Sequence, residues 1–272
     1  MNDPKPILRG RSSVWLERRP VTSEVASSSL VVPAIFNQGL KSNLGPLIFF
    51  AADASGVRRN RNRAGILVAD VSGHRMTDAL IAAMLHQSFL LGVYYELEMF
   101  GQVTTRIFEH INERFYRSSS VNKYFTMIYG EVSTRGRFRF ISAGHPPPAV
   151  FSREFDRFMT IGENRKISSI PVGMLPSGGD PDEKHHPSLH GRKSLYAVNE
   201  IDLLAAGDIL LLHTDGLSEH DHGRFFPARA ERLFADHKDE SAEAISNRLR
   251  ETLLAGGVRE DDISVVVVKY AP

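Results

Sequence analysis

The strongest constraint on the fold is a repeated pattern of short apolar runs that come in pairs, joined by polar, turn-forming residues. One pair spans residues 47–52 and 64–69, and a second spans residues 124–132 and 138–142, around Ser133-Thr-Arg-Gly136. Such pairs are typical of β-hairpins. Because hairpins dominate and no βαβ repeat is present, the sequence predicts an α+β fold with mainly antiparallel sheets.

Helical periodicity begins at Met76, where apolar residues recur at steps of three and four. Two successive helices are predicted here, each with a stripe that faces the core. The first stripe consists of Met76, Ala79, Leu80, Ala83, Met84, Leu91 and Tyr94, and the second of Val103, Ile107, Ile111 and Phe115. Two more helices are predicted over residues 228–235 and 241–254, with Ser241 as the N-cap of the last.

Further strands are predicted before and after these helices. Residues 24–32 are predicted as a first strand, and residues 33–45 as a loop because Asn and Gly recur in them. Residues 149–151 are expected to continue the meander of the second hairpin. Residues 209–212, after the Gly207-Asp208 turn, and residues 263–270 are expected to form the last two strands.

Composition limits the chemistry that the chain can perform. The 272 residues include no cysteine, which excludes disulfides, thiol nucleophiles and Cys-ligated metals. With 33 basic and 32 acidic residues, the net charge of +1 argues against a nucleic-acid binder. No apolar run approaches the ~18 residues of a membrane span, and the first residues lack the apolar segment of a secretory signal. We therefore expect a cytoplasmic protein with neither a membrane nor a nucleic acid as its partner.

A single domain is expected over residues 24–272, because no step in the predicted order of elements marks a boundary. Residues 1–23 are expected to form an N-terminal tail or switch segment. Residues 177–194 are polar, contain three histidines together with Pro and Gly, and are expected to form an exposed insertion. The basic tip of the first hairpin, residues 53–63, fits either a solvated loop or a docking patch for an acidic partner or a phosphate.

Aspartates recur where apolar strands end or begin. Asp70 ends the run 66–69, Asp215 follows the run 209–214, and Asp261 directly precedes the last strand. Any one of them fits a turn or a helix N-cap. If the strand ends meet at one edge, however, the carboxylates repel one another unless a cation neutralises them. Ligand sets made only of oxygen suit Mg²⁺ and Mn²⁺.

Four strings, in this order along the chain, favour the metal interpretation. They are Ala69-Asp-Val-Ser-Gly-His74, Ala143-Gly-His-Pro-Pro-Pro148, Gly207-Asp-Ile-Leu-Leu-Leu-His-Thr-Asp-Gly-Leu-Ser-Glu219 and Asp261-Asp-Ile-Ser264. Together they resemble the metal-dependent (PPM-type) serine/threonine phosphatases, and most closely the bacterial SpoIIE/RsbU-like branch. The resemblance covers residues 24–270.

The resemblance implies a β-sandwich of two mainly antiparallel sheets flanked by helices, a four-layer αββα arrangement, with a site for two Mn²⁺ or Mg²⁺ ions at one edge. By motif match, Asp70 bridges both ions and the backbone carbonyl of Val71 adds a ligand. Asp215 and Asp261 hold the second ion. Asp70, Asp215 and Asp261 are thus the catalytic candidates. Water activated by the metals would attack the phosphoryl group directly, with no covalent enzyme intermediate.

The chain departs from the family pattern beside the expected site. The family usually carries a metal-binding Asp on the first strand of the hairpin, where this chain has Pro46. Asp53 is the only substitute, although it looks more like the start of the turn. With this ligand in doubt, a single bound ion is the alternative to two. Arg75 stands where the family has Gly, and there it fits either a contact to substrate phosphate or a solvent-exposed position. His74 and His145 are each expected to have structural roles.

The activity that the resemblance implies is hydrolysis of phosphoserine or phosphothreonine on a phosphorylated regulatory protein of the anti-anti-sigma-factor type. Regulatory input is expected from a separate activating protein or from a homodimer. The missing first-strand Asp supports an alternative from another class, a pseudophosphatase with weak or no activity that acts as a partner-binding module. Hydrolysis of a small phosphoester by the same metal chemistry is a third interpretation.

Overall fold

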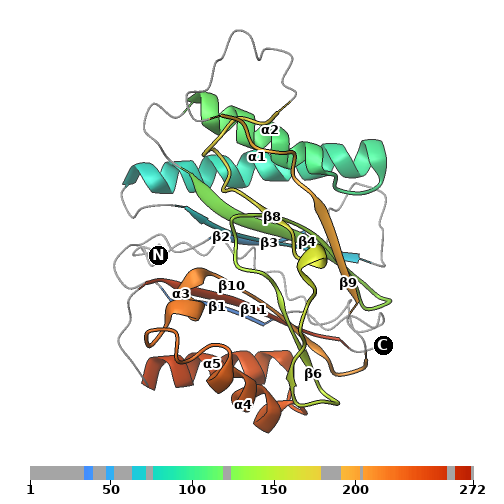
Figure 1. The fold of residues 1–272 in the computed structure, drawn as a ribbon, viewed down its shortest axis with the longest axis vertical. Coiled ribbons are helices and arrows are strands. Elements are labelled where there is room, and N and C mark those ends of the chain that lie inside the picture. Colours follow the sequence, from blue (N-terminus) through green and yellow to red (C-terminus); the bar gives the residue numbers. More distant parts are fainter. Residues whose placement is uncertain are drawn as a thin grey trace, which may run out of the picture.

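The computed structural model describes residues 34–38, 47–51, 63–71, 76–118, 124–178, 191–202, 205–255 and 261–270. Two β-sheets lie face to face, and helices cover the outer face of each sheet (Figure 1). Four layers therefore follow one another from top to bottom of the view. The predicted αββα sandwich is confirmed.

The first sheet has the strand order β2-β3-β4-β5-β8, and β9 also pairs with β5. Its strands are β2 (Leu47–Ala51), β3 (Arg63–Val71), β4 (Phe125–Ser133), β5 (Arg137–Ala143), β8 (Ser168–Ser169) and β9 (Val198–Asp202). The pairs β2–β3 and β4–β5 are the two predicted hairpins. Within β3, Leu67 and Ala69 pack in the core under the helices, whereas Ile66 and Val68 pack in the core between the sheets. This alternation places one face of the strand in each core.

The second sheet has the order β1-β11-β10-β6-β7. Its strands are β1 (Ala34–Gln38), β6 (Ala149–Ser152), β7 (Arg157–Phe158), β10 (Ile209–His213) and β11 (Ile263–Lys269). Two predictions are wrong here. Residues 34–38 form a strand, not a loop, because they pair with the distant β11, and β6 pairs with β10 instead of continuing the first sheet. The strand predicted over residues 24–32 lies outside the described residues.

Two pairs of helices form the outer layers. The helices α1 (Met76–Phe100) and α2 (Thr105–Ser118) cover the first sheet, and α4 (Ala228–His237) and α5 (Ala242–Ala255) cover the second (Figure 1). The short α3 (Asp215–Glu219) follows β10, and a 3-10 turn spans Glu163–Arg165. Ser241 caps α5 as predicted, because its Oγ accepts a hydrogen bond from the Ala244 N–H at 3.1 Å.

The apolar stripe predicted for α1 is wrong, whereas that of α2 is confirmed. Leu85, Phe89 and Val93 pack against the first sheet, while Leu80 and Leu91 are 61% and 71% exposed. Apolar residues occur around most of α1, so their spacing alone does not show which face is buried. Ile107, Ile111 and Phe115 of α2 are buried, as is Val103 just before the helix.

The stretch Leu80–Phe100 of α1 has a mean hydropathy of 1.2 over a window long enough to cross a membrane, judged by length and composition alone. The sequence predicted no such stretch. In the structure, this helix packs on the first sheet through three buried side chains, as described above. The predicted absence of a membrane partner stays a prediction.

The insertion predicted as exposed is buried at both of its ends. Ser177 and Lys193 form a β-bridge with each other, and both side chains contact the Glu109 carboxylate of α2, with Lys193 Nζ at 2.9 Å. Burial of the Lys193 ammonium lowers its pKa, and the hydrogen bond that it donates to Glu109 opposes that shift. The ends are therefore fixed on α2 by a paired charge, which the polar sequence did not indicate. Residues 179–190, with the three histidines, lie outside the described residues.

Candidate metal centre

Three strand ends bring aspartates to one end of the sandwich. Asp70 is the last residue but one of β3, Asp215 follows β10, and Asp261 precedes β11. Because β10 and β11 are antiparallel, with His213 opposite Val265, the end of β10 lies beside the start of β11. The carboxylate of Asp70 on the other sheet interacts electrostatically with those of Asp215 and Asp261, so all three belong to one cluster.

The strand alternation shows which way Asp70 faces. Val68 and Ile66, two and four residues before Asp70, point into the core between the sheets, so Asp70 lies on that same side of β3. Its partner in the register is Thr126 of β4, which shares this side with Ile128. The candidate centre therefore closes one end of the core between the two sheets.

The electrostatics of Asp70 are those of a carboxyl group in a crowded, partly dry site. Its pKa is raised from 3.8 to about 7, first by burial and then by the charges of Asp215, Asp261 and Asp262. The pKa of Asp215 is also raised, first by burial and then by Asp261, while the hydrogen bond from the Gly216 N–H opposes the shift. Mutual repulsion of this kind is relieved by a bound cation.

The Thr-Asp-Gly string fits tightly against β11. The Thr214 N–H donates to the Ser264 carbonyl at 3.0 Å, and the Ser264 N–H donates to Thr214 Oγ1 at 3.0 Å. Thr214 Oγ1 donates to the Asp262 carbonyl at 3.3 Å. A Cβ on Gly216 would overlap the carbonyl of Asp262, so only glycine fits there. The string thus fixes Asp215 relative to the start of β11.

Asp208, just before β10, shows that an acid at a strand end does not by itself belong to the site. Asp208 precedes β10, at the opposite end from Asp215, and is fully buried. Its carboxylate accepts hydrogen bonds from the Arg153 N–H at 3.0 Å and the Ala205 N–H at 2.9 Å. Asp208 is therefore a structural turn residue, as the sequence predicted for the Gly207-Asp208 turn.

The donor set suits a hard divalent cation. Carboxylates from three chain segments lie at one end of the sandwich and interact electrostatically, and the backbone carbonyl of Val71 lies at the end of β3 beside Asp70. Within the part of the chain that the structure describes, no three acidic or histidine side chains are close enough to form a complete ligand set. In charge and chemistry these residues fit a divalent cation. The roles predicted for Asp70, Val71, Asp215 and Asp261 stay predictions.

Three other candidates, Asp53, His74 and Arg75, lie outside the described residues. The described part of β2 ends at Ala51, so the role of Asp53 as a metal ligand stays a prediction.

Sequence reasoning missed the polar residues that surround the aspartates. Thr126 lies opposite Asp70, and Thr214 and the Asp262 backbone surround Asp215. The strings that carried the family resemblance contain Thr214 and Asp262, so they were within reach of the sequence, whereas Thr126 is found only through the register of β4. His145 is buried and hydrogen-bonded, which agrees with the structural role expected for it.

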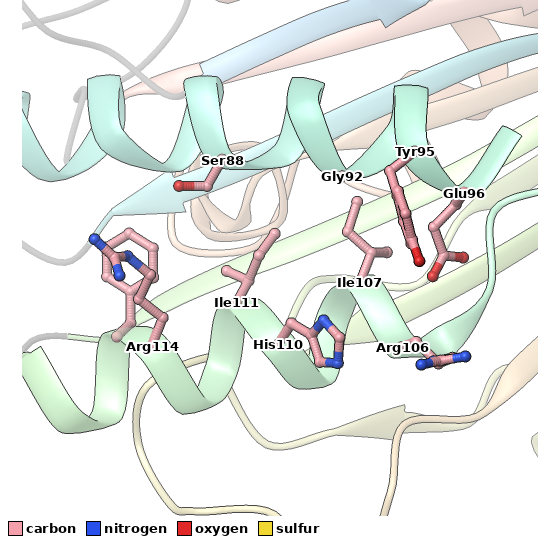
Figure 2. A pocket seen from close by; sticks show the side chains of 10 residues that line it. Ser88, Gly92, Tyr95, Glu96, Arg106, Ile107, His110, Ile111 and Arg114 are labelled. Carbon is pink, nitrogen blue, oxygen red and sulfur yellow. The ribbon is translucent and has the colours of Figure 1, made fainter. Parts of the chain in front are cut away.

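A groove of about 200 Å³ lies elsewhere, between α1 and α2 on the outer face (Figure 2). Its lining includes Tyr95 from α1 and Arg106, His110 and Arg114 from α2. None of the lining residues is one of the strand-end aspartates. The chemistry of the candidate centre thus comes from the end of the sandwich and not from this groove.

The sequence and the fold were compared with those of known proteins. The sequence model for Stage II sporulation protein E (SpoIIE) matches residues 60–271. Phosphoserine phosphatase RsbP of Bacillus subtilis (strain 168) is 33% identical over 160 residues, which are 57% of this chain and 38% of RsbP. The RsbU and RsbW domains of Rv1364c from Mycobacterium tuberculosis superpose with a TM-score of 0.63 at 19% identity, covering 90% of this chain and 61% of that chain. The SiaA-PP2C domain of Pseudomonas aeruginosa gives a TM-score of 0.62 at 17% identity, covering 88% and 85% of the two chains.

The two stacked sheets and their outer helices have the fold of the PP2C domain. The match to the SpoIIE sequence model extends over most of the chain. The chain therefore belongs to the SpoIIE family, as the four strings predicted. It spans 38% of the length of RsbP and 61% of the mycobacterial chain. The activity, substrates and partners of those longer proteins are therefore proposals for this one.

Proposed function

We propose that this chain is a metal-dependent protein phosphatase that hydrolyses phosphoserine or phosphothreonine on a phosphorylated regulatory protein. The observation that carries the proposal is the charge cluster at the end of the sandwich, where burial and three neighbouring aspartates raise the pKa of Asp70 to about 7. Such a cluster is costly without a cation and is well suited to hold one.

The residues divide into three roles. Asp70, Asp215, Asp261 and the carbonyl of Val71 are the groups that would hold Mn²⁺ or Mg²⁺, two ions or one. Bound cations of this kind lower the pKa of water and neutralise charge on a phosphoryl group. Thr214 and Gly216 fix the position of Asp215 against β11, so that the carboxylates are in place before substrate arrives. Arg75 is the candidate for a contact with the substrate phosphate.

The substrate class rests on the family. RsbP is by name a phosphoserine phosphatase, and a protein of the anti-anti-sigma-factor type is our candidate for the phosphorylated substrate. We further propose an activating protein partner or a homodimer as the source of regulation, and a cytoplasmic location, in line with the absence of cysteine.

The test is Mn²⁺-dependent hydrolysis of p-nitrophenyl phosphate and of a phosphoserine peptide. We expect turnover by the wild type that needs Mn²⁺ or Mg²⁺. Asp70→Asn and Asp215→Asn should each lower it by roughly 100-fold or more, because losing a metal ligand removes several kcal/mol of transition-state stabilisation. Asp202→Asn, an exposed aspartate on β9, is the matched control and should keep full activity. A wild type without metal-dependent turnover on either substrate contradicts the proposal.

A second candidate is a pseudophosphatase that binds a partner without hydrolysis. It is favoured by β2, whose sequence Leu-Ile-Phe-Phe-Ala carries no acid, so the described part of this strand offers no ligand beside Asp70. Turnover on phosphopeptides separates the two candidates. Tight Mn²⁺ binding without turnover on any phosphopeptide supports the pseudophosphatase, and turnover on a phosphopeptide excludes it.

A further inference from the structure

His145 lies between the end of β3 that carries Asp70 and the end of β10 that leads to Asp215. It follows β5 by two residues, and its side chain is only 3% exposed. Its Nδ1 lies 3.0 Å from Thr126 Oγ1, and Thr126 is the residue directly opposite Asp70 in the β3–β4 register. The imidazole is therefore linked to Asp70 through one intervening residue, Thr126.

The backbone that carries His145 is held firmly. Ser142 Oγ donates a hydrogen bond to the His145 carbonyl at 3.3 Å, and the Gly144 N–H donates to the Ser169 carbonyl at 2.6 Å. Gly144 has a φ of +64°, and a Cβ at this position would lie 2.5 Å from Pro171 Cγ. This loop thus leaves the ring little freedom, and the ring position is set by the fold of the first sheet.

The other side of the ring faces the second sheet. The pKa of His145 is lowered to about 3, first by burial and then by the charge of His213 at the end of β10, while an interaction with the His213 backbone opposes the shift. The ring is therefore neutral, with one donor and one acceptor nitrogen. Its Nε2 is buried and makes no hydrogen bond of normal geometry with the described residues, and His213 is two residues from Asp215.

From these contacts we propose that His145 is a positioning residue that links the two sheets at the candidate centre. It holds Thr126, opposite Asp70, against the end of β10, which carries Asp215. In this way it sets the distance between the carboxylates of the two sheets. The inference about geometry stands on the contacts of His145, and only its consequence for catalysis rests on the proposed function.

The first experiment measures that geometry without metal or activity. Since the chain has no native cysteine, spin labels can be attached at Tyr124→Cys, before β4, and Glu219→Cys, in α3. Both residues are exposed, and each lies beside a strand of a different sheet, Tyr124 before β4 and Glu219 in α3 after β10. In the otherwise native chain we expect a narrow distance distribution by electron paramagnetic resonance. Adding His145→Phe should broaden or shift it, because phenylalanine fills the space but can neither hydrogen-bond to Thr126 nor interact with the His213 backbone. His145→Asn should restore part of the order, since its amide can replace Nδ1 toward Thr126.

The second experiment measures Mn²⁺ affinity by calorimetry in the chain without labels. His145→Phe should weaken binding by about 10-fold or more, which is typical when a group that orients a metal ligand is lost. The control is Phe234→Leu, in the core under α4, which lowers stability far from the centre and should change neither the affinity nor the label distance.

The outcomes separate the two proposals. An unchanged label distance in His145→Phe, or the same change in Phe234→Leu, overturns the role of His145 whatever Mn²⁺ does. A wild type that binds no Mn²⁺ while His145→Phe still disorders the labels overturns the proposed phosphatase and leaves the role of His145 supported.

Discussion

The two halves of the candidate centre are held in place by different forces. The second-sheet half, which comprises Thr214, Asp215 and Gly216 with the start of β11, is fixed by hydrogen bonds and by hard backbone contact. The first-sheet half, Asp70 with Thr126, is placed by the strand register and is opposed by charge. Packing therefore sets one half of the centre whatever it binds, whereas the other half stays electrostatically strained unless a cation is bound.

The largest effect should follow from Gly216→Ala in the second-sheet half. The new methyl group would overlap the Asp262 carbonyl, which is backbone and cannot move without shifting β11. We expect a loss of about 2–3 kcal/mol in the free energy of unfolding by urea titration, together with weaker Mn²⁺ binding. Gly162→Ala is the control, because its nearest neighbour is the side-chain oxygen of Asn164. An equal loss in both variants would contradict hard contact at Gly216.

The two threonines provide a direct comparison of the halves. Thr214→Val leaves the Ser264 N–H and the Asp262 carbonyl without their side-chain partner in a fully buried position, so we expect a loss of about 2 kcal/mol. Thr126→Val removes a single hydrogen bond, to His145, and should cost about 1 kcal/mol or less. Unfolding of both variants in urea checks the order. A larger loss for Thr126→Val would show that the first-sheet half is the more tightly packed one.

Local pattern explains which parts of this molecule could be predicted. The hairpins β2–β3 and β4–β5 follow from alternation and turn residues that are close in sequence. In contrast, β1 forms only because β11 pairs with it, and β6 changes sheets after Pro146-Pro-Pro148, which no local signal records. In α1 the apolar residues are too widely spread to mark one face, while in α2 charged residues mark the exposed side.

The residues of the candidate site also differ in whether the sequence could predict them. The aspartates could be found because strand ends and short strings mark them, and Gly216 because the Thr-Asp-Gly string contains it. The role of Thr126 depends on the register opposite Asp70, and the contacts of His145 depend on how the two sheets stack. These are tertiary facts, and a single sequence contains no signal for them.

Removing charge from the first-sheet half should stabilise the metal-free protein. Asp70→Asn relieves the repulsion from Asp215, Asp261 and Asp262, so we expect the free energy of unfolding at pH 7.5 to rise by about 1–2 kcal/mol. The matched variant Asp208→Asn should have the opposite sign, because its carboxylate accepts two backbone hydrogen bonds. Thermal unfolding with and without EDTA measures both. A destabilised Asp70→Asn would contradict the electrostatic strain in this half.

The smallest effect concerns pH and the residue that joins the halves. The pKa of His145 is lowered to about 3 in the folded chain, against 6.5 in an exposed histidine. The unfolded chain therefore takes up a proton as the pH falls below 6.5, while the folded chain does not. Stability from this group is complete above that pH and is lost on acidification toward pH 3. From pH 7 to 5.5 the loss should be about 1 kcal/mol. His213, whose pKa burial also lowers, acts in the same direction.

His145→Gln should flatten the pH dependence of stability, measured by urea unfolding at the two pH values. His110→Gln, exposed on α2, serves as the control. An unchanged slope in His145→Gln would mean that the ring is not held neutral between the two sheets.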